Sequence, residues 1–472
     1  MYVKSFLVLA LALAPLVAAA QEGDGFHMQP SLHWKSGAHR VDLGAVLRVR
    51  TEAWDAFADD TDWFTGTRTR LRMQYGWAGK VLVAGEFQDV QLHGMSSDSS
   101  GAALNYRNAN DADSHASGDS IRGLFVELRP SETSFLRVGR QDVKLGQELL
   151  YPEPNWRYLK TARLGERLVG TVGWSHVERA YDGASAGWNV SGVQLFGFGA
   201  RPTTGVFDAE TGYRPLHDVV VGGGTLTVAR GKLAPSSELG LFALHYKDDR
   251  PTDEGGLPDD VALTTFGAHW LGVYALGPGN ADVLLWGAAQ YGRYNDLDQS
   301  AGAAVVELGY QLPGVFGKPW LRAGLNYATG DGDPTDGDHD TFANLMPTNH
   351  LYYGFIDQLA LQNLTNWFVQ LRAAPHEKVS LNLFVHWFRL SNEDDARYGG
   401  TGAFSDSAFG YVARPSLGYR HVAVEYDAVA TIALHPSATL ELGYSWMDGA
   451  AMFRTAPSDD AKFFYASIEL RY

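Results

Sequence analysis

Hydrophobic and polar side chains alternate along many short segments of this chain, which is the pattern of β-strands. In the stretch TRTRLRMQYGW, residues 67–77, Arg68, Arg70 and Arg72 share one face, and Leu71 lies on the other with further apolar groups. This follows because successive side chains of a strand point to opposite faces. A soluble sheet would bury the apolar face, whereas a membrane barrel would turn it to lipid and direct the arginines into a wet lumen.

The same alternation recurs in segments of about ten residues, the length of a strand that crosses an outer membrane. No helical periodicity stands out after the N-terminal segment. The predicted strands cover residues 41–54, 67–77, 79–91, 121–130, 133–142, 176–184, 187–198, 218–230, 236–248, 261–274, 280–292, 300–311, 318–329, 364–373, 377–388, 421–434, 436–447 and 461–472. Their number, about 18, is even, as in bacterial single-chain barrels.

The connections between these segments alternate between short and long. Gly and Pro mark the short turns at 77–79, 130–132, 185–187, 231–235, 276–279, 312–314, 374–376 and 434–436, where they favour tight backbone bends. The long connections are 55–66, 92–120, 143–175, 199–217, 249–260, 330–363, 389–420 and 448–460, with 293–299 as a short exception. We therefore predict an all-β fold, a transmembrane antiparallel β-barrel of about 18 strands with short periplasmic turns and long extracellular loops.

The N-terminus predicts export. Lys4, the apolar run 6–13 and the small residues 18–20 resemble a secretory signal peptide that is cleaved after residue 20. No other stretch reaches the ~20 apolar residues of a membrane-spanning helix. We divide the chain into a signal peptide (1–20), a short periplasmic segment (21–40) and an outer-membrane barrel (41–472).

Composition narrows the partners further. The chain contains no cysteine, which fits an exported protein that folds without disulfides, and aromatic residues make up 12% of it, as expected for girdles at the membrane interfaces. Its formal net charge is −16. Such a surface repels nucleic acid and other polyanions, so local clusters of arginine carry more information.

Basic residues gather on the predicted lumen face. Strand parity places there Arg48, Arg50, Arg68, Arg70, Arg72, Arg137, Arg322 and Arg372, with Arg129 and Arg471 near the periplasmic end. Arg140 falls on the lipid side by strict alternation, so we expect it next to a bulge or above the membrane. Loop 143–175 adds Lys144, Arg157, Lys160, Arg163 and Arg167, and a loop of this length can fold inward and narrow the pore.

These cations have two interpretations, and the residues alone leave both open. Guanidinium groups stay ionised and pair with carboxylates in a planar fork, so rings of arginine select anions. Alternatively, the arginines brace the wall by pairing with lumenal acids. The available acids are Asp42, Glu52, Glu86, Glu127, Glu307, Glu425, Asp427, Glu441 and Glu469.

Three stretches resemble the alginate export family of outer-membrane porins. They are TRTRLRMQ at 67–74, LRVGRQDVKLGQELLYPEPNWR at 136–157 followed by ERAYDGA at 178–184, and TGDGDPTDGDHDTFANLMPTNHLYYGFIDQLALQNL at 329–364. The last stretch carries the family's loop motif at Phe342, Pro347, His350, Tyr352, Gly354, Asp357 and Asn363. The resemblance implies a monomeric 18-stranded barrel that passes an acidic polysaccharide through an arginine-lined constriction.

One turn departs from the family's alginate exporter, which has a long periplasmic turn near its C-terminal end that can close the pore. The corresponding residues here, 434–437, predict a tight turn. This departure weakens the expectation of a periplasmic gate.

An acidic run and the absence of catalytic motifs bear on two other kinds of site, a metal site and an enzyme active site. The acidic run Asp331, Asp333, Asp336, Asp338 and Asp340 offers hard oxygen ligands for Ca²⁺, but its spacing is not that of an EF-hand. A solvated outer loop is the better interpretation.

The chain has no Gly-x-Ser-x-Gly, His-Glu-x-x-His or Gly-rich phosphate loop, so we predict no enzyme and no catalytic residues. We expect His350 and Asp357 to hydrogen bond within their loop.

The sequence thus predicts a Gram-negative outer-membrane channel for an anionic polysaccharide, with alginate export as the first choice. Its other expected partners are outer-membrane lipid, the barrel-assembly machinery, for which the alternating C-terminal segment ending in Tyr472 resembles an insertion signal, and components of a periplasmic polysaccharide-export apparatus. No cofactor is expected beyond the Ca²⁺ candidate. The alternatives are an uptake porin for small carboxylates or acidic oligosaccharides and, less favoured, a barrel receptor or enzyme.

Overall fold

The computed structural model describes residues 32–58, 60–250, 260–333, 335–399, 413–449, 451–453, 458 and 460–472. The expected signal peptide at 1–20 and most of the expected periplasmic segment at 21–40 lie outside these residues.

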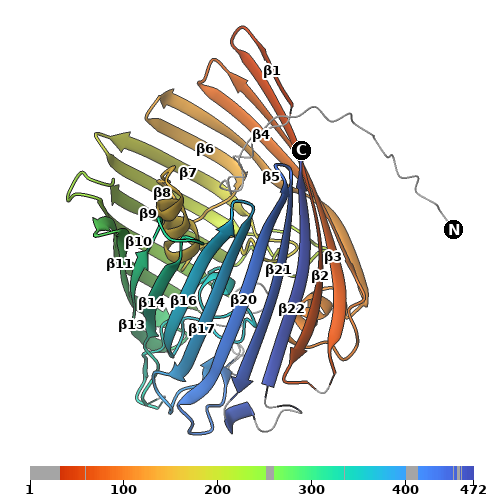
Figure 1. Cartoon of the computed structure of the whole chain (residues 1–472), viewed down its shortest axis with the longest axis vertical. Coiled ribbons are helices and arrows are strands. Elements are labelled where there is room, and N and C mark those ends of the chain that lie inside the picture. Colours follow the sequence, from red (N-terminus) through yellow and green to blue (C-terminus); the bar gives the residue numbers. More distant parts are fainter. Residues whose placement is uncertain are drawn as a thin grey trace, which may run out of the picture.

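Eighteen antiparallel strands close into a barrel in the described part of the chain (Figure 1). They are β2 (His39–Ala56), β3 (Asp62–Trp77), β4 (Val81–His93), β5 (His115–Ser131), β6 (Ser134–Gln141), β7 (Tyr181–Val190), β8 (Val193–Pro202), β9 (Val219–Val228), β10 (Ser237–Asp248), β11 (Val261–Leu276), β12 (Gly279–Tyr294), β13 (Leu297–Gln311), β14 (Trp320–Ala328), β16 (Leu364–His376), β17 (Val379–Leu390), β20 (His421–His435), β21 (Ala438–Gly449) and β22 (Asp460–Arg471). The barrel closes where β22 pairs with β2, from Val46 opposite Arg471 to Ala56 opposite Ala461. The predicted fold class is confirmed.

The two faces of β3 differ in their exposure, as the alternation of its residues predicts for a barrel. Leu71 and Met73 are 53% and 55% exposed on the outside, whereas Arg68 and Arg70 are each 5% exposed on the inside. Many further strands leave large apolar side chains exposed on the outer face. An exposed apolar belt around a closed barrel is the surface that lipid covers.

The connections are sorted by length as predicted, with two short ones on the long-loop side. The predicted long connection 55–66 covers only 57–61, and the exception noted at 293–299 is a two-residue turn at 295–296. Most tight turns and the C-terminus lie at the upper end of the barrel in Figure 1, and the described parts of the long loops lie at the other end. By the general rule for outer-membrane barrels, the end with tight turns is periplasmic. Only Pro436 and Ser437 separate β20 from β21, so the tight turn expected there is confirmed.

The predicted strands 176–184 and 187–198 were misplaced. The structure has β7 and β8 instead, joined by a turn at Ser191 and Gly192 with φ of 53° and 88°. Two positive φ values are the mark of a tight hairpin turn. Gly187, taken from the sequence as a turn residue, lies inside β7, where a Cβ would come within 2.3 Å of the Phe135 ring. That glycine serves close packing and not a bend.

The remaining elements are small. β1 (Leu32–Ser36) forms a hairpin with β2, a strand that the sequence did not predict. Helix α1 (Gly101–Ala109) in the β4–β5 loop was also missed, because it is short and buries only three side chains. The others are α2 (Pro154–Tyr158), the π-helix η1 (Leu159–Leu164), β15 (Asp338–His339), η2 (Asn349–Leu351), β18 (Arg397–Tyr398), β19 (Ala413–Arg414) and η3 (Ala451–Phe453). Of the helices in the described residues, none is long and apolar enough to cross a membrane.

Candidate functional site

Five arginines of β2 and β3 line one side of the inner wall, and we call them the arginine ladder: Arg48, Arg50, Arg68, Arg70 and Arg72. They occupy alternate positions of two neighbouring strands, and the register sets Arg48 directly opposite Arg68. All five therefore face inward, as parity predicted. The first four are only 1–7% exposed, so something other than water must neutralise them.

Carboxylates of the wall and of one loop neutralise the ladder. Arg50 pairs with Glu52 of β2 and Arg72 with Glu86 of β4, whereas Arg68 and Arg70 pair with a loop residue. The connection between β6 and β7, residues 142–180, folds into the barrel, and we call it the first inward loop. Its Glu178 accepts Nη1 of Arg68 at 2.6 Å and Nη2 of Arg70 at 2.8 Å. The other Glu178 oxygen lies 2.7 Å from Nη2 of Arg122 on β5. One loop carboxylate thus joins three wall arginines.

The charge state of Glu178 follows from this surrounding. Burial on its own would raise the pKa of its carboxyl, but Arg70 and the other nearby cations outweigh that effect and hold the pKa well below its usual value. Glu178 is therefore ionised at neutral pH. It acts as a fixed counter-ion of Arg68 and Arg70.

Backbone carbonyls complete the contact. The carbonyl oxygen of Ser175 accepts Nη2 of Arg48 at 2.8 Å, and that of Trp174 accepts Nη1 of Arg50 at 2.7 Å. The Arg50 guanidinium also lies 3.7 Å from the centre of the Trp174 ring. These bonds hold residues 174–178 flat against β2 and β3.

The other end of the first inward loop contacts the opposite wall. There the loop supplies the cations and the wall supplies the carboxylates. Nζ of Lys160 lies 2.6 Å from Glu238 on β10, and Arg163 makes a forked contact with Glu307 on β13 at 2.8 and 3.0 Å. All of these side chains are buried. Two cations that the sequence offered as pore-lining are thus anchors that fix the loop to wall carboxylates. Arg157, at the end of α2, is half-buried.

The connection between β14 and β16, residues 329–363, is the second inward loop. It is hydrogen bonded to the first inward loop. Met346 bridges to Val169, and its carbonyl oxygen accepts the Gly170 N–H at 2.9 Å. The Thr348 hydroxyl donates to Glu166 at 2.8 Å. The two inward loops therefore form one unit that crosses the lumen between the β2–β3 and β10–β13 walls.

The family-like motif residues hold the second loop in place. His350 Nδ1 and Asp357 Oδ2 are 2.8 Å apart, so the expected hydrogen bond is present. Gly354 has φ of 81°, and a Cβ there would lie 2.3 Å from the Glu425 carboxylate of β20, so only glycine fits. Glu425 also accepts the Ile356 N–H at 3.0 Å.

Three further motif residues lie within the same loop. Phe342 and Pro347 are buried. The Asn363 amide donates to the carbonyl oxygens of Asn392 and Ala396, each at 2.9 Å. These contacts explain the motif as the fixing points of a folded loop.

The other predicted pore arginines lie in different surroundings. Arg322 pairs with Asp282 and Glu307, Arg137 with Glu127, and Arg140 with Asp182. Arg140 is opposite the outward-facing Leu124 in the sheet register, so the structure does not bring it to the inner wall. Arg129 and Arg471 pair with Glu127 and Glu469.

Arg48 and Arg372 differ from the rest: neither forms an ion pair with a carboxylate in the part of the chain that the structure describes. Arg48 is covered by Ser175, but Arg372, near the periplasmic end of β16, is only half-buried. Its guanidinium lies 3.6 Å from the centre of the Tyr158 ring and 5.8 Å from that of Trp320. Its Nε is buried and has no hydrogen-bond partner among the described residues. Arg372 is thus a cation that packs on two aromatic rings, which we call its aromatic platform. It also has one N–H donor that no described residue accepts.

Sequence reasoning missed Arg122, which is fully buried and joins Glu86, Asp142 and Glu178. Parity put it on the lipid face, but a bulge in β5 makes it the extra residue between Ile121 and Gly123, which reverses its direction. An arginine within an otherwise apolar outward face was the available signal. Tyr158 and Trp320 were missed because aromatic residues are common throughout the chain.

The acidic run 331–340 forms turns. The carboxylates of Asp333 and Asp336 accept the N–H groups of Thr335 and Asp338, at 3.2 and 2.9 Å, and both are exposed. Within the described ranges, no group of three or more His, Cys, Asp or Glu side chains is placed to hold a metal ion.

Comparison with known proteins agrees with this architecture. The family model described as alginate export matches residues 39–466. Similar solved structures include Pseudomonas aeruginosa OccK9 (OpdG), at 11% identity and a TM-score of 0.60 over 92% of this chain and 98% of that one. P. aeruginosa OpdK with vanillate is 11% identical, with a TM-score of 0.56 over 91% and 98%. Acinetobacter baumannii OccAB1 is 10% identical, with a TM-score of 0.57 over 92% and 96%. Comparison with curated proteins gives no match.

Proposed function

The chain belongs to the alginate export family and is a channel of the Gram-negative outer membrane; on that premise we propose that it passes an acidic polysaccharide, alginate being the first candidate, past a charged constriction. The observation that carries the proposal is that the inner cations differ in their partners. The ladder fixes the first inward loop across the lumen, and Arg372 remains without a carboxylate partner among the described residues.

The chemistry of a polyuronate matches Arg372 and its platform. Such a polymer carries one carboxylate on each sugar, so a pore must exchange hydration for charge at each step without holding any unit tightly. A half-buried guanidinium offers charge-assisted hydrogen bonds, and the Tyr158 and Trp320 rings provide apolar surface for a sugar face. We assign no bond-breaking step to the chain.

Small carboxylates are a second candidate solute. The similar barrel of OpdK was crystallised with vanillate, itself a carboxylate. One guanidinium on an aromatic platform also suits a single aromatic acid. The two candidates differ in length, so they are separable by experiment.

The test is single-channel recording of the refolded protein in a planar bilayer. We expect an anion preference, and concentration-dependent block by oligomannuronate but not by a neutral oligosaccharide of equal length. Block by benzoate-type acids alone would favour the small-carboxylate candidate. A cation-selective channel that oligomannuronate leaves unchanged would refute the proposal.

A further inference from the structure

The periplasmic rim of the barrel is not level. β22 ends opposite Ala45 and Val46, but β2 begins six residues earlier along the strand, at His39. β1 pairs with that free length, from Leu32 opposite Leu43 to Ser36 opposite His39. We call the resulting projection the periplasmic wing: β1 and the periplasmic ends of β2, β3, β4 and β5, seen at the top of Figure 1.

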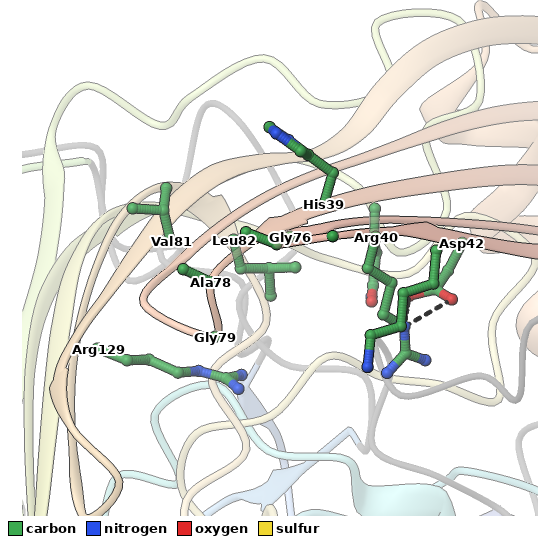
Figure 2. A pocket seen from close by; sticks show the side chains of 13 residues that line it. His39, Arg40, Asp42, Gly76, Ala78, Gly79, Val81, Leu82 and Arg129 are labelled. Carbon is green, nitrogen blue, oxygen red and sulfur yellow. Dashed lines mark hydrogen bonds and ion pairs between the residues drawn. The ribbon is translucent and has the colours of Figure 1, made fainter.

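The lumen-side face of the wing is hollowed. A cavity of about 540 Å³ lies there, lined by side chains from all five strands (Figure 2). Gly37, Gly76 and Gly79 are among the residues that line it. A volume in the range of about 300–1,000 Å³ is typical of ligand sites.

The cavity carries an excess of positive charge. Its cations are Lys35, Arg40 and Arg129. Arg40 pairs with Asp42 at 2.7 Å, and Arg129 pairs with Glu127 at 2.7 Å. Both keep exposed side chains, at 59% and 44%. Lys35 has no ion-pair partner among the residues that the structure describes.

Two details add to that excess. Glu127 is already shared with Arg137, at 2.7 Å, so two arginines divide one carboxylate. Figure 2 shows the Arg129 side chain extending past Gly79 into the space, while Arg40 lies against Asp42. The wing is therefore a concave basic surface on a chain whose overall charge is −16.

The cavity is continuous with the wall that carries the ladder. Gln74 of β3 lines it, and Arg72 is two residues further along the same strand on the same face. We propose that the periplasmic wing is the entry site of the channel, where a linear acidic polysaccharide is captured from the periplasm before it reaches the constriction. This inference rests on the proposed function and adds to it a place and a direction of loading.

The chemistry of the wing suits capture and release. Exposed cations that are partly neutralised attract a polyanion at long range, yet each contact exchanges readily because it is weak. Such a surface mainly raises the association rate and does so less at high salt.

The test uses the full barrel in a planar bilayer, with oligomannuronate added to one side at a time. The variant is Lys35→Gln combined with Arg129→Gln, which leaves Glu127 paired with Arg137. The matched control is Lys318→Gln with Lys378→Gln, two exposed lysines on the β13–β14 and β16–β17 turns of the same rim. Because all four side chains are exposed, each variant should keep the heat-modifiable electrophoretic mobility of a folded barrel, which verifies folding.

We expect the on-rate of block from the periplasmic side to fall about tenfold at low salt in the wing variant. The on-rate from the extracellular side, and both rates in the control, should stay unchanged. Block of the wild type with an unaltered periplasmic on-rate in the wing variant would overturn the entry site alone. Absence of block in the wild type from either side would overturn the proposed function and the entry site together.

Discussion

The ladder arginines of β3 and Arg372 of β16 look alike in the sequence and differ in the structure. Both belong to strands whose alternation turns them inward. Arg68 and Arg70 are buried against Glu178 of the first inward loop, whereas Arg372 is half-buried on Tyr158 and is not neutralised by any described carboxylate. Lumenal position therefore does not decide the role of an arginine. The partner that the loops bring to it does.

Removing the shared counter-ion of Arg68 and Arg70 should have the largest effect. Glu178→Gln leaves Arg68, Arg70 and Arg122 without their shared charge in a buried site, which should cost about 3–5 kcal/mol of stability. We expect the first inward loop to detach, giving a larger and noisier conductance and unfolding at lower denaturant concentration. Asp249→Asn, at an exposed pair with Lys247 outside the inward loops, is the control and should change neither. Unchanged conductance in Glu178→Gln would show that the loop does not depend on the ladder.

Much of the barrel was predictable because its cause is local. Alternation of side chains and the sorting of turns and loops are properties of neighbouring residues, so strand number, faces and orientation followed from them. The errors have local causes as well. The Gly187 position was taken for a turn although it serves packing against Phe135, and the β5 bulge reversed Arg122.

The partners of the cations were not predictable, because they depend on contacts between distant residues. Glu178 meets Arg68 across 110 positions of sequence, and Arg163 meets Glu307 across 144. Nothing near Arg163 indicates that it anchors a loop to the far wall. The bracing interpretation therefore applies to the buried, paired cations, whereas anion selection by Arg372 remains a proposal.

Acid should act on the ladder and only at low pH. The pKa of Glu178 is depressed in the folded protein, so its ion pairs contribute full stability above the unfolded-state pKa of about 4.3 and lose it as the pH falls toward the folded value. We expect constant conductance and noise between about pH 5 and 8 and loop release only at still lower pH. Recording across this range tests it. A transition near neutral pH would contradict the assignment of this control to Glu178.

Calcium should have the smallest effect. The carboxylates of Asp333 and Asp336 already accept backbone N–H groups and face solvent, so they are a poor cage for a cation that needs several converging oxygens. We expect the thermal unfolding temperature to be the same in millimolar Ca²⁺ and in chelator. A clear rise of the unfolding temperature with Ca²⁺, removed by Asp333→Asn, would instead support a Ca²⁺ site in this acidic run.

The most direct test of the account compares Arg372→Gln with Arg137→Gln, an arginine that Glu127 neutralises. The measured quantity is the affinity of the channel for oligomannuronate, taken as the inverse of its blocking concentration. Loss of a charge-assisted hydrogen bond of about 1.5–3 kcal/mol predicts a fall of at least tenfold in Arg372→Gln and little change in Arg137→Gln. An equal fall in affinity in both variants, or no fall in Arg372→Gln, would contradict the account. Its claim is that the arginine without a carboxylate partner binds the carboxylates of the solute.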